Sequence, residues 1–139
     1  MLASLPKITT LLKSCQTIAV VGLSPKENRP SNDVARYLIK AGFTVIPVNP
    51  GQDEILGRKC YPNLAAIPEK IDLVNIFRRS EDVEPVVDEA IAIKAKGVWM
   101  QQGIVNEKAA AKAKAAGLQV IMDRCIKVDH ANLFNCLPT

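Results

Sequence analysis

Residues 17–31 read TIAVVGLSPKENRPS, an apolar run that ends at Gly22 and gives way to a polar loop. The run over residues 17–23 is continuously apolar after its first residue, as expected of a central strand covered on both faces. The segment VARYLIKA then places apolar residues at helical spacing and predicts a helix. A buried strand, a polar loop and a helix together form the opening unit of a parallel α/β sheet.

The first half of the chain continues this alternation. Ser31 or Asn32 is expected to cap the first crossover helix, and Gly42 is expected to end it in the left-handed conformation. Residues 43–48, FTVIPV, follow directly and predict a second strand. Pro47 cannot donate to a ladder, so we expect it near a strand end or on the sheet edge.

Three shorter elements are predicted around these units. Residues 4–14 space their apolar side chains at helical intervals, with Leu5 on the apolar face, and predict an amphipathic helix lying on the domain. Residues 59–61 predict a short third strand, and residues 63–70, NLAAIPEK, predict a short helix.

The second half of the chain repeats the pattern. Further strands are predicted at residues 71–77, 97–101 and 118–123. A helix is expected to start at Ser80 or Asp82, with Pro85 tolerated because it lies near that start. Asn106 is expected to cap the alanine-rich helix that Gly117 ends.

The alternation predicts an α/β fold, a single doubly wound parallel sheet in three α/β/α layers. The strand order would be 3-2-1-4-5-6 if residues 59–61 count as a strand. No linker divides the chain, so residues 1–139 are expected to form one domain with its core over about residues 5–128. The tail, residues 129–139, is expected to form a short helix around residues 130–134 and to fray at Pro138.

Composition excludes several functional classes. A chain of 139 residues with 48% hydrophobic residues suffices for one core. The net charge of +4 is spread without a dense basic run, which favours a small anionic ligand over nucleic acid. No signal peptide and no run of ~20 apolar residues is present, so we expect a soluble, cytoplasmic protein without a membrane partner.

The thiols and the single histidine are too scattered for a zinc site. No C-x-x-C pair occurs, and the simplest interpretation is that the cysteines are free thiols in a reducing cytosol. The cysteines are Cys15, Cys60, Cys125 and Cys136.

The loop after the first strand has the composition of an anion site. Ligands of doubly wound sheets bind outside the carboxyl ends of the strands, where the strand order reverses. This loop combines a glycine, two hydroxyls and two cations ahead of a helix N-terminus. These residues are Gly22, Ser24, Ser31, Lys26 and Arg29. The loop lacks the glycines of the dinucleotide and Walker patterns, and by itself fits a pyrophosphate site or an ordinary polar connection.

The loop after the second strand bears on the nucleotide. An NAD-binding domain usually places an acid at the end of this strand, where the present chain has Asn49. Asp53 and Glu54 come too late in the loop. Arg58 and Lys59 suit a ribose that bears a phosphate, so this loop argues against NAD and leaves NADP or coenzyme A.

Two further loops lie at the same predicted edge. Arg78 and Arg79 suit phosphate binding or adenine stacking, although a solvated helix start is the alternative. Gln101, Gln102 and Gly103 can position a ligand but are poor acids or bases.

Three single residues invite a functional role. Cys125 ends a strand at the binding edge, but no histidine is visibly paired with it, which favours a structural thiol over a nucleophile. Trp99 lies inside a predicted strand and is expected in the core. His130 is expected to serve surface or packing roles.

Together these segments resemble the small stand-alone CoA-binding proteins, whose domain is like the N-terminal CoA-binding domain of the succinyl-CoA synthetase α subunit. The resemblance covers about residues 5–128. It rests on TIAVVGLSPKENRPS, GFTVIPVNP, YPNLAAIPEKIDLVNIFRRSEDV, EAIAIKAKGVWMQQGIVNEKAAAKAKAAGL and VIMDRC. It implies a Rossmann-like domain that binds coenzyme A.

The resemblance also implies positions for the ligand. The phosphate end would be lined by Gly22, Leu23, Ser24, Lys26, Arg29, Pro30 and Ser31. The nucleotide would be bordered by Val48, Asn49 and Pro50. Adenine and pantetheine would be flanked by Phe77, Arg78 and Arg79. A turn ending in glycine would be formed by Gln101, Gln102 and Gly103.

The departures from the synthetases point to binding without catalysis. Their phosphorylated histidine lies in a second domain that has no counterpart in these residues, and no catalytic triad, metal-ligand set or carboxylate pair is visible. We therefore expect a non-catalytic protein that binds CoA or an acyl-CoA. The alternative is an NADP-dependent oxidoreductase of the same fold. A third interpretation makes Cys125 a redox residue that forms a mixed disulfide with CoA. The acyl group and the oligomeric state stay open.

Overall fold

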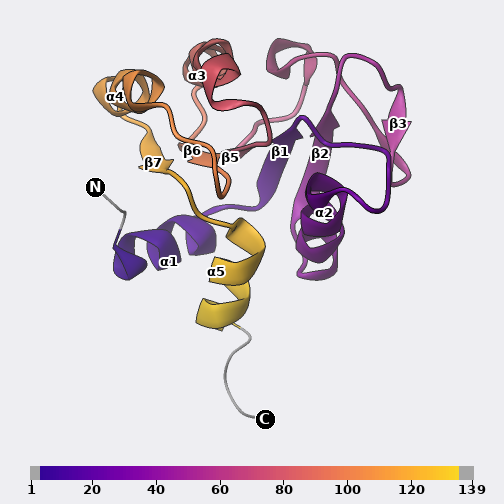
Figure 1. Ribbon diagram of the computed structural model, residues 1–139, viewed down its shortest axis with the longest axis horizontal. Helices are drawn as coiled ribbons and strands as arrows, with labels where there is room; N and C mark the ends of the chain where they lie inside the picture. The colour runs from indigo at the N-terminus through magenta and orange to yellow at the C-terminus, as the bar shows by residue number, and fades with distance from the viewer. Residues whose placement is uncertain (1–3, 135–139) are drawn as a thin grey trace.

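A five-stranded parallel sheet forms the middle layer of the molecule (Figure 1). The computed structural model describes residues 4–134. In spatial order the strands are β2 (Thr44–Val48), β1 (Thr17–Val21), β5 (Leu73–Ile76), β6 (Gly97–Met100) and β7 (Gln119–Ile121). The strand order reverses between β1 and β5, which confirms the predicted doubly wound, Rossmann-like arrangement.

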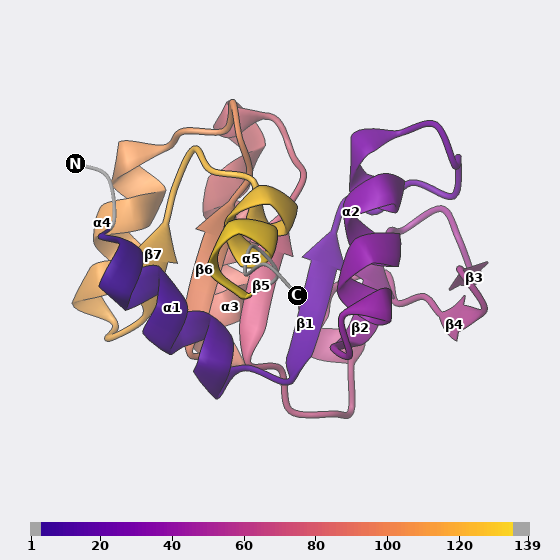
Figure 2. The ribbon, with the colours of Figure 1, turned by 90° about the horizontal axis from the view of Figure 1, so that it is seen from below.

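Helices cover both faces of this sheet (Figure 2). One face carries α1 (Leu5–Ser14), α2 (Pro30–Lys40) and α5 (Ile126–Phe134), and the other carries α3 (Val83–Ala92) and α4 (Glu107–Ala115). Because both faces are covered, every residue of β5 and β6 is buried, as their apolar runs predict. Trp99 lies in this core as expected, and its Nε1 donates to the Arg124 carbonyl oxygen at 2.8 Å.

The predicted third strand is reduced to a single bridge. Tyr61 pairs in parallel with Val48, beyond the outer edge of β2, so the order 3-2-1-4-5-6 holds at this one residue. Its N–H donates to the Pro47 carbonyl oxygen at 3.1 Å, but Pro47 has no N–H to extend the ladder. The residues just before form a separate antiparallel hairpin of β3 (Glu54–Ile55) and β4 (Arg58–Lys59).

One predicted helix cap differs from the structure and another is confirmed. The cap predicted at Ser31 or Asn32 is wrong, because α2 begins at Pro30 and has Arg29 at its N-cap. Pro30 fits the first helical position, where its missing N–H costs nothing. The predicted cap of α4 is confirmed, since Asn106 Oδ1 accepts from the Ala109 N–H at 2.9 Å.

Two 3-10 turns and the N-terminal helix complete the helical part of the fold. One 3-10 turn, η2 (Ser80–Asp82), precedes α3, and another, η1 (Leu64–Ala66), is all that forms of the helix predicted over residues 63–70. The turn η1 ends ahead of Pro68, because a proline disfavours helical backbone in the residue before it. The amphipathic helix α1 is confirmed, although Leu5 points outward and is 52% exposed. None of the helices within residues 4–134 combines the length and the apolar character needed to cross a bilayer.

His130 serves packing within α5. Its Nδ1 lies 2.7 Å from the Tyr37 hydroxyl oxygen, and its ring packs against Phe43 and Phe134. Burial lowers the pKa of this imidazole below its usual range. The predicted fraying at Pro138 lies outside the described residues. Through Phe134 the tail is a helix that packs on α1 and α2.

Gly22 lies where the backbone at the end of β5 approaches closely. A Cβ atom at this position would lie 2.1 Å from the Phe77 carbonyl oxygen, and the glycine has a φ of +86°. Both facts require glycine, because an L side chain would meet the backbone and strain the left-handed conformation. In the folded chain this glycine of the predicted anion loop makes room for the end of β5.

Replacing Gly22 by alanine should therefore destabilise the fold severely. We expect Gly22→Ala to lower the free energy of unfolding by more than about 3 kcal/mol, from overlap with Phe77 and from backbone strain. Gly117→Ala is the matched control, since Gly117 has a φ of +90° with nothing within 4 Å of an added Cβ. The control should lose about 1–2 kcal/mol. Equal losses in urea unfolding would contradict the role of the Phe77 contact.

The buried imidazole predicts a stability that depends on pH. Because burial lowers the pKa of folded His130, the unfolded chain binds the proton more tightly, and acid favours unfolding. This stability is fully present above the unfolded pKa of about 6.5 and declines as pH falls below it. We expect His130→Gln to flatten the change in unfolding free energy between about pH 7.5 and about pH 5. An unchanged slope would assign it to other groups.

Candidate functional site

A hollow of about 420 Å³ opens at the carboxyl ends of β1 and β5, where the strand order reverses. It is lined by Gly22, Ser24, Lys26, Arg29, Pro30, Ser31 and Phe77. Six of these are the residues predicted for the phosphate end, and Phe77 joins them from the end of β5. Leu23, also predicted there, turns its side chain into the core.

Ser24 is the point at which the loop after β1 is tied to helix α2. Its backbone N–H donates to the Ser31 hydroxyl oxygen at 3.0 Å, and its carbonyl oxygen accepts from Asn32 Nδ2 at 2.9 Å. The Ser24 hydroxyl in turn accepts from the Lys26 N–H at 3.1 Å. The side chains expected to cap α2 therefore brace this loop, which fixes the shape of the hollow before any ligand arrives.

The charge that faces this hollow is positive. Lys26 and Arg29 are both exposed, and neither makes a hydrogen bond through its side chain or an ion pair within residues 4–134. The N–H of Ser31, in the first turn of α2, also has no acceptor in the part of the chain that the structure describes. Two unpaired cations and a helix N-terminus together favour an anion.

Asn49 connects the second loop to the first. Its Nδ2 donates to the Leu23 carbonyl oxygen at 3.0 Å, and its Oδ1 accepts from the Gly51 N–H at 2.9 Å. A carboxylate could not make the first of these bonds, because it has no proton to donate. This bracing explains why an amide stands where NAD-binding domains carry an acid.

Other residues predicted to contact the nucleotide lie farther from the hollow. Val48 packs its side chain in the core, and Pro50 lies outside the lining of the hollow. Arg58 and Lys59 belong to the β3–β4 hairpin, where Lys59 Nζ lies 5.2 Å from the centre of the Tyr61 ring. The role of these four residues in ligand binding stays a prediction.

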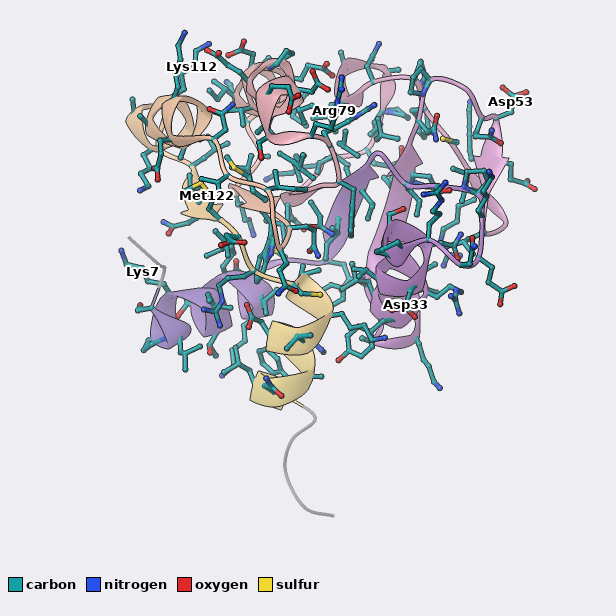
Figure 3. The ribbon with its side chains drawn as sticks, in the orientation of Figure 1. Lys7, Asp33, Asp53, Arg79, Lys112 and Met122 are labelled. Carbon is teal, nitrogen blue, oxygen red and sulfur yellow. The ribbon has the colours of Figure 1, made fainter. Side chains whose placement is uncertain are left out.

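The two arginines after β5 also stand outside the hollow. Arg79 is 76% exposed, and its Nε donates to Asp82 Oδ2 at 3.0 Å. It lies on the α3 side of the sheet, opposite Asp33 on α2 (Figure 3). Arg78 is half-buried and has no ion pair within the described ranges. Its charge is therefore available to a ligand at this edge.

A second hollow of about 400 Å³ adjoins the first, since both are lined by Pro30 and Phe77. Its remaining lining is Val34, Gln101, Gln102, Ile104 and Cys125. Gly103 lies in the same turn with a φ of +86°, and its N–H donates to Asp123 Oδ1 at 2.7 Å. Val34 and Ile104 were missed by the sequence analysis, because no pattern distinguishes an apolar side chain in a groove from one in the core.

The thiols differ sharply in their surroundings. Cys15 and Cys60 are buried, and desolvation raises the pKa of both. Cys125 is half-buried and lines the second hollow. Cys136 lies outside the described residues. Among residues 4–134, no group of three or more His, Cys, Asp or Glu side chains could hold a metal ion.

The sequence shows the family to which this architecture belongs. The sequence model of the CoA binding domain matches residues 16–131. The uncharacterized protein YneT of Bacillus subtilis is 46% identical over 125 residues, which cover 90% of this chain and 93% of YneT. The ADP-forming acetate–CoA ligase I of Archaeoglobus fulgidus is 39% identical over 74 residues, which cover 53% of this chain but 11% of the ligase.

A solved structure shares the fold of this chain. A hypothetical protein from Pyrococcus horikoshii superposes with a TM-score of 0.92 at 40% identity, over 94% of this chain and 92% of that one. The fold and the sequence match agree with the resemblance noted from the sequence. The chain therefore belongs to the CoA binding domain family.

Proposed function

We propose that this protein binds coenzyme A or an acyl-CoA without catalysing a reaction, and that the first hollow holds the diphosphate. The observation that carries this proposal is the pair of unpaired cations, Lys26 and Arg29, beside the N-terminus of α2. A diphosphate is the part of CoA that such a site recognises best. A small molecule, rather than nucleic acid or a membrane, is the partner we propose.

The second hollow favours CoA over NADP as the ligand. Pro30, Val34, Phe77 and Ile104 give it a largely apolar lining with a few polar groups. A flexible pantetheine arm leaving the diphosphate matches such a lining. NADP, the alternative ligand, would place a polar ribose and a nicotinamide ring on the far side of its diphosphate.

The lining of both hollows supports binding without catalysis. The ionisable side chains that line the two hollows are those of Lys26, Arg29 and Cys125, and no carboxylate or imidazole is among them. The two hollows therefore offer neither the carboxylate pair nor the histidine that general acid–base catalysis most often uses. The ligase activity of the longer relatives is not carried over, because this chain spans 11% of the first such ligase.

Titration calorimetry with CoA, 3'-dephospho-CoA and NADPH tests the identity of the ligand. We expect CoA to bind most tightly and 3'-dephospho-CoA to bind more weakly, because neighbouring cations such as Arg58, Lys59 or Arg78 would lose a partner. Equal affinity for the two CoA forms would remove the argument for these cations. Binding of NADPH alone would replace this proposal with the oxidoreductase alternative.

The position of the diphosphate is tested by removing one positive charge from the first hollow. Arg29→Gln should weaken CoA binding about tenfold, because an unpaired cation is removed from the hollow. Lys40→Gln is the matched control, since Lys40 carries the same charge at the opposite, exposed end of α2. The control should bind like the unmodified protein. Equal weakening in both variants would show that net charge, rather than this hollow, attracts the ligand.

A further inference from the structure

The carboxamide of Gln101 has an unused donor beside the second hollow. Gln101 is 4% exposed, and its Oε1 accepts from the Ile126 N–H at 3.1 Å. Because that N–H can only donate, the oxygen must face Ile126 and the Nε2 amide must face away. Nε2 donates to no residue within the described part of the chain, although Gln101 lines this hollow.

A donor that borders the hollow and has no partner among the described residues suits a ligand with a carbonyl oxygen. Gln101 Nε2 is not among the fully buried polar atoms that lack a partner, so a ligand in the hollow can reach it. The pantetheine arm of CoA carries two amide carbonyls, and an acyl-CoA adds a thioester carbonyl. The second hollow therefore suits the arm that follows the diphosphate, in keeping with the proposed function on which this step rests.

Cys125 lines the second hollow, which forms one groove with the first through the shared residues Pro30 and Phe77. Lys26 and Arg29 line the first hollow, Phe77 lines both, and Cys125 lines the second. The residue also borders a third hollow of about 170 Å³ with Arg124 and Asp129. These two pair with each other, Arg124 Nε lying 2.7 Å from Asp129 Oδ2, so the negative charge of Asp129 is balanced beside an approaching anion.

The other thiols of the fold are unsuited to exchange with a ligand. Cys15 and Cys60 are 7% and 6% exposed, and burial raises the pKa of each, which disfavours the reactive thiolate. Neither lines the two adjoining hollows. Among the three thiols within residues 4–134, the one that reacts with a bound CoA should therefore be Cys125.

We propose that Cys125 forms a mixed disulfide with coenzyme A by exchange with oxidised CoA, the symmetrical CoA disulfide. Cys125 loses its proton to solvent, and its sulfur attacks one sulfur of the CoA disulfide. The original S–S bond breaks as the new bond between Cys125 and CoA forms. The second CoA leaves as a thiolate that takes up a proton. The protein thiol is oxidised and one CoA is reduced, so the step needs no other oxidant.

Mass spectrometry of the intact, reduced protein after incubation with CoA disulfide tests this exchange. The Cys136→Ser variant is used throughout, so that the adduct is confined to Cys15, Cys60 and Cys125. We expect one CoA adduct, mapped to Cys125 by peptide analysis and absent from the additional variant Cys125→Ser. Glutathione disulfide at the same concentration should react at least about tenfold more slowly, because binding through the diphosphate raises the local concentration of the CoA sulfur.

Two further variants show whether the groove directs the reaction. Arg29→Gln should slow exchange with CoA disulfide about tenfold and leave exchange with glutathione disulfide unchanged. Gln101→Glu keeps an acceptor for the Ile126 N–H but removes the Nε2 donor, and should also slow the CoA reaction selectively. Equal rates for the two disulfides, or an adduct on Cys15 or Cys60, would overturn the proposal.

Calorimetry with reduced CoA on the Cys125→Ser variant separates this proposal from the proposed function. Binding there, with no adduct on the unmodified Cys125, would reject the exchange and leave the CoA site intact. Absence of CoA binding in both proteins would reject the proposed function and the exchange together.

Discussion

The contact between Gly22 and the Phe77 carbonyl is the constraint on which the ligand site depends. It lets the ends of β1 and β5 approach closely at the point where the chain winds in opposite directions. Helix α2 leaves this point on one face of the sheet and η2 with α3 leaves it on the other. The hollow between the diverging connections is therefore a consequence of the sheet topology. Gly22 contributes by having no Cβ atom that would meet the Phe77 carbonyl oxygen.

Hydrogen bonds between loops give this hollow its shape. Ser31 and Asn32 hold Ser24 from helix α2, and Asn49 holds Leu23 from the neighbouring strand. The polar groups of these three side chains bond to the protein itself. The side chains of Lys26 and Arg29, by contrast, make no hydrogen bond or ion pair within the described residues. The division is the one expected of a preorganised anion site, in which rigid neighbours position groups that are kept for the ligand.

Much of the fold was predictable because its signals are local. Continuous apolar runs such as residues 17–23 indicate strands buried on both faces, and Asn106 indicates the start of a helix by its own side chain. The wrong cap prediction arose because both candidate residues had a competing partner. Ser31 and Asn32 are good caps by composition, but Ser24 is within their reach, and Pro30 can start the helix without a cap.

The sequence by itself determined the strand–helix alternation, the loops at the binding edge and the likeness to CoA-binding domains. These depend on residue type and spacing along the chain, which need no long-range contact. Only the tertiary structure decided which loop residues meet. It brings Phe77 to Lys26 and Arg29, and it places Gln101 and Cys125 around the second hollow. Such choices depend on contacts between segments far apart in sequence, and no local pattern records them.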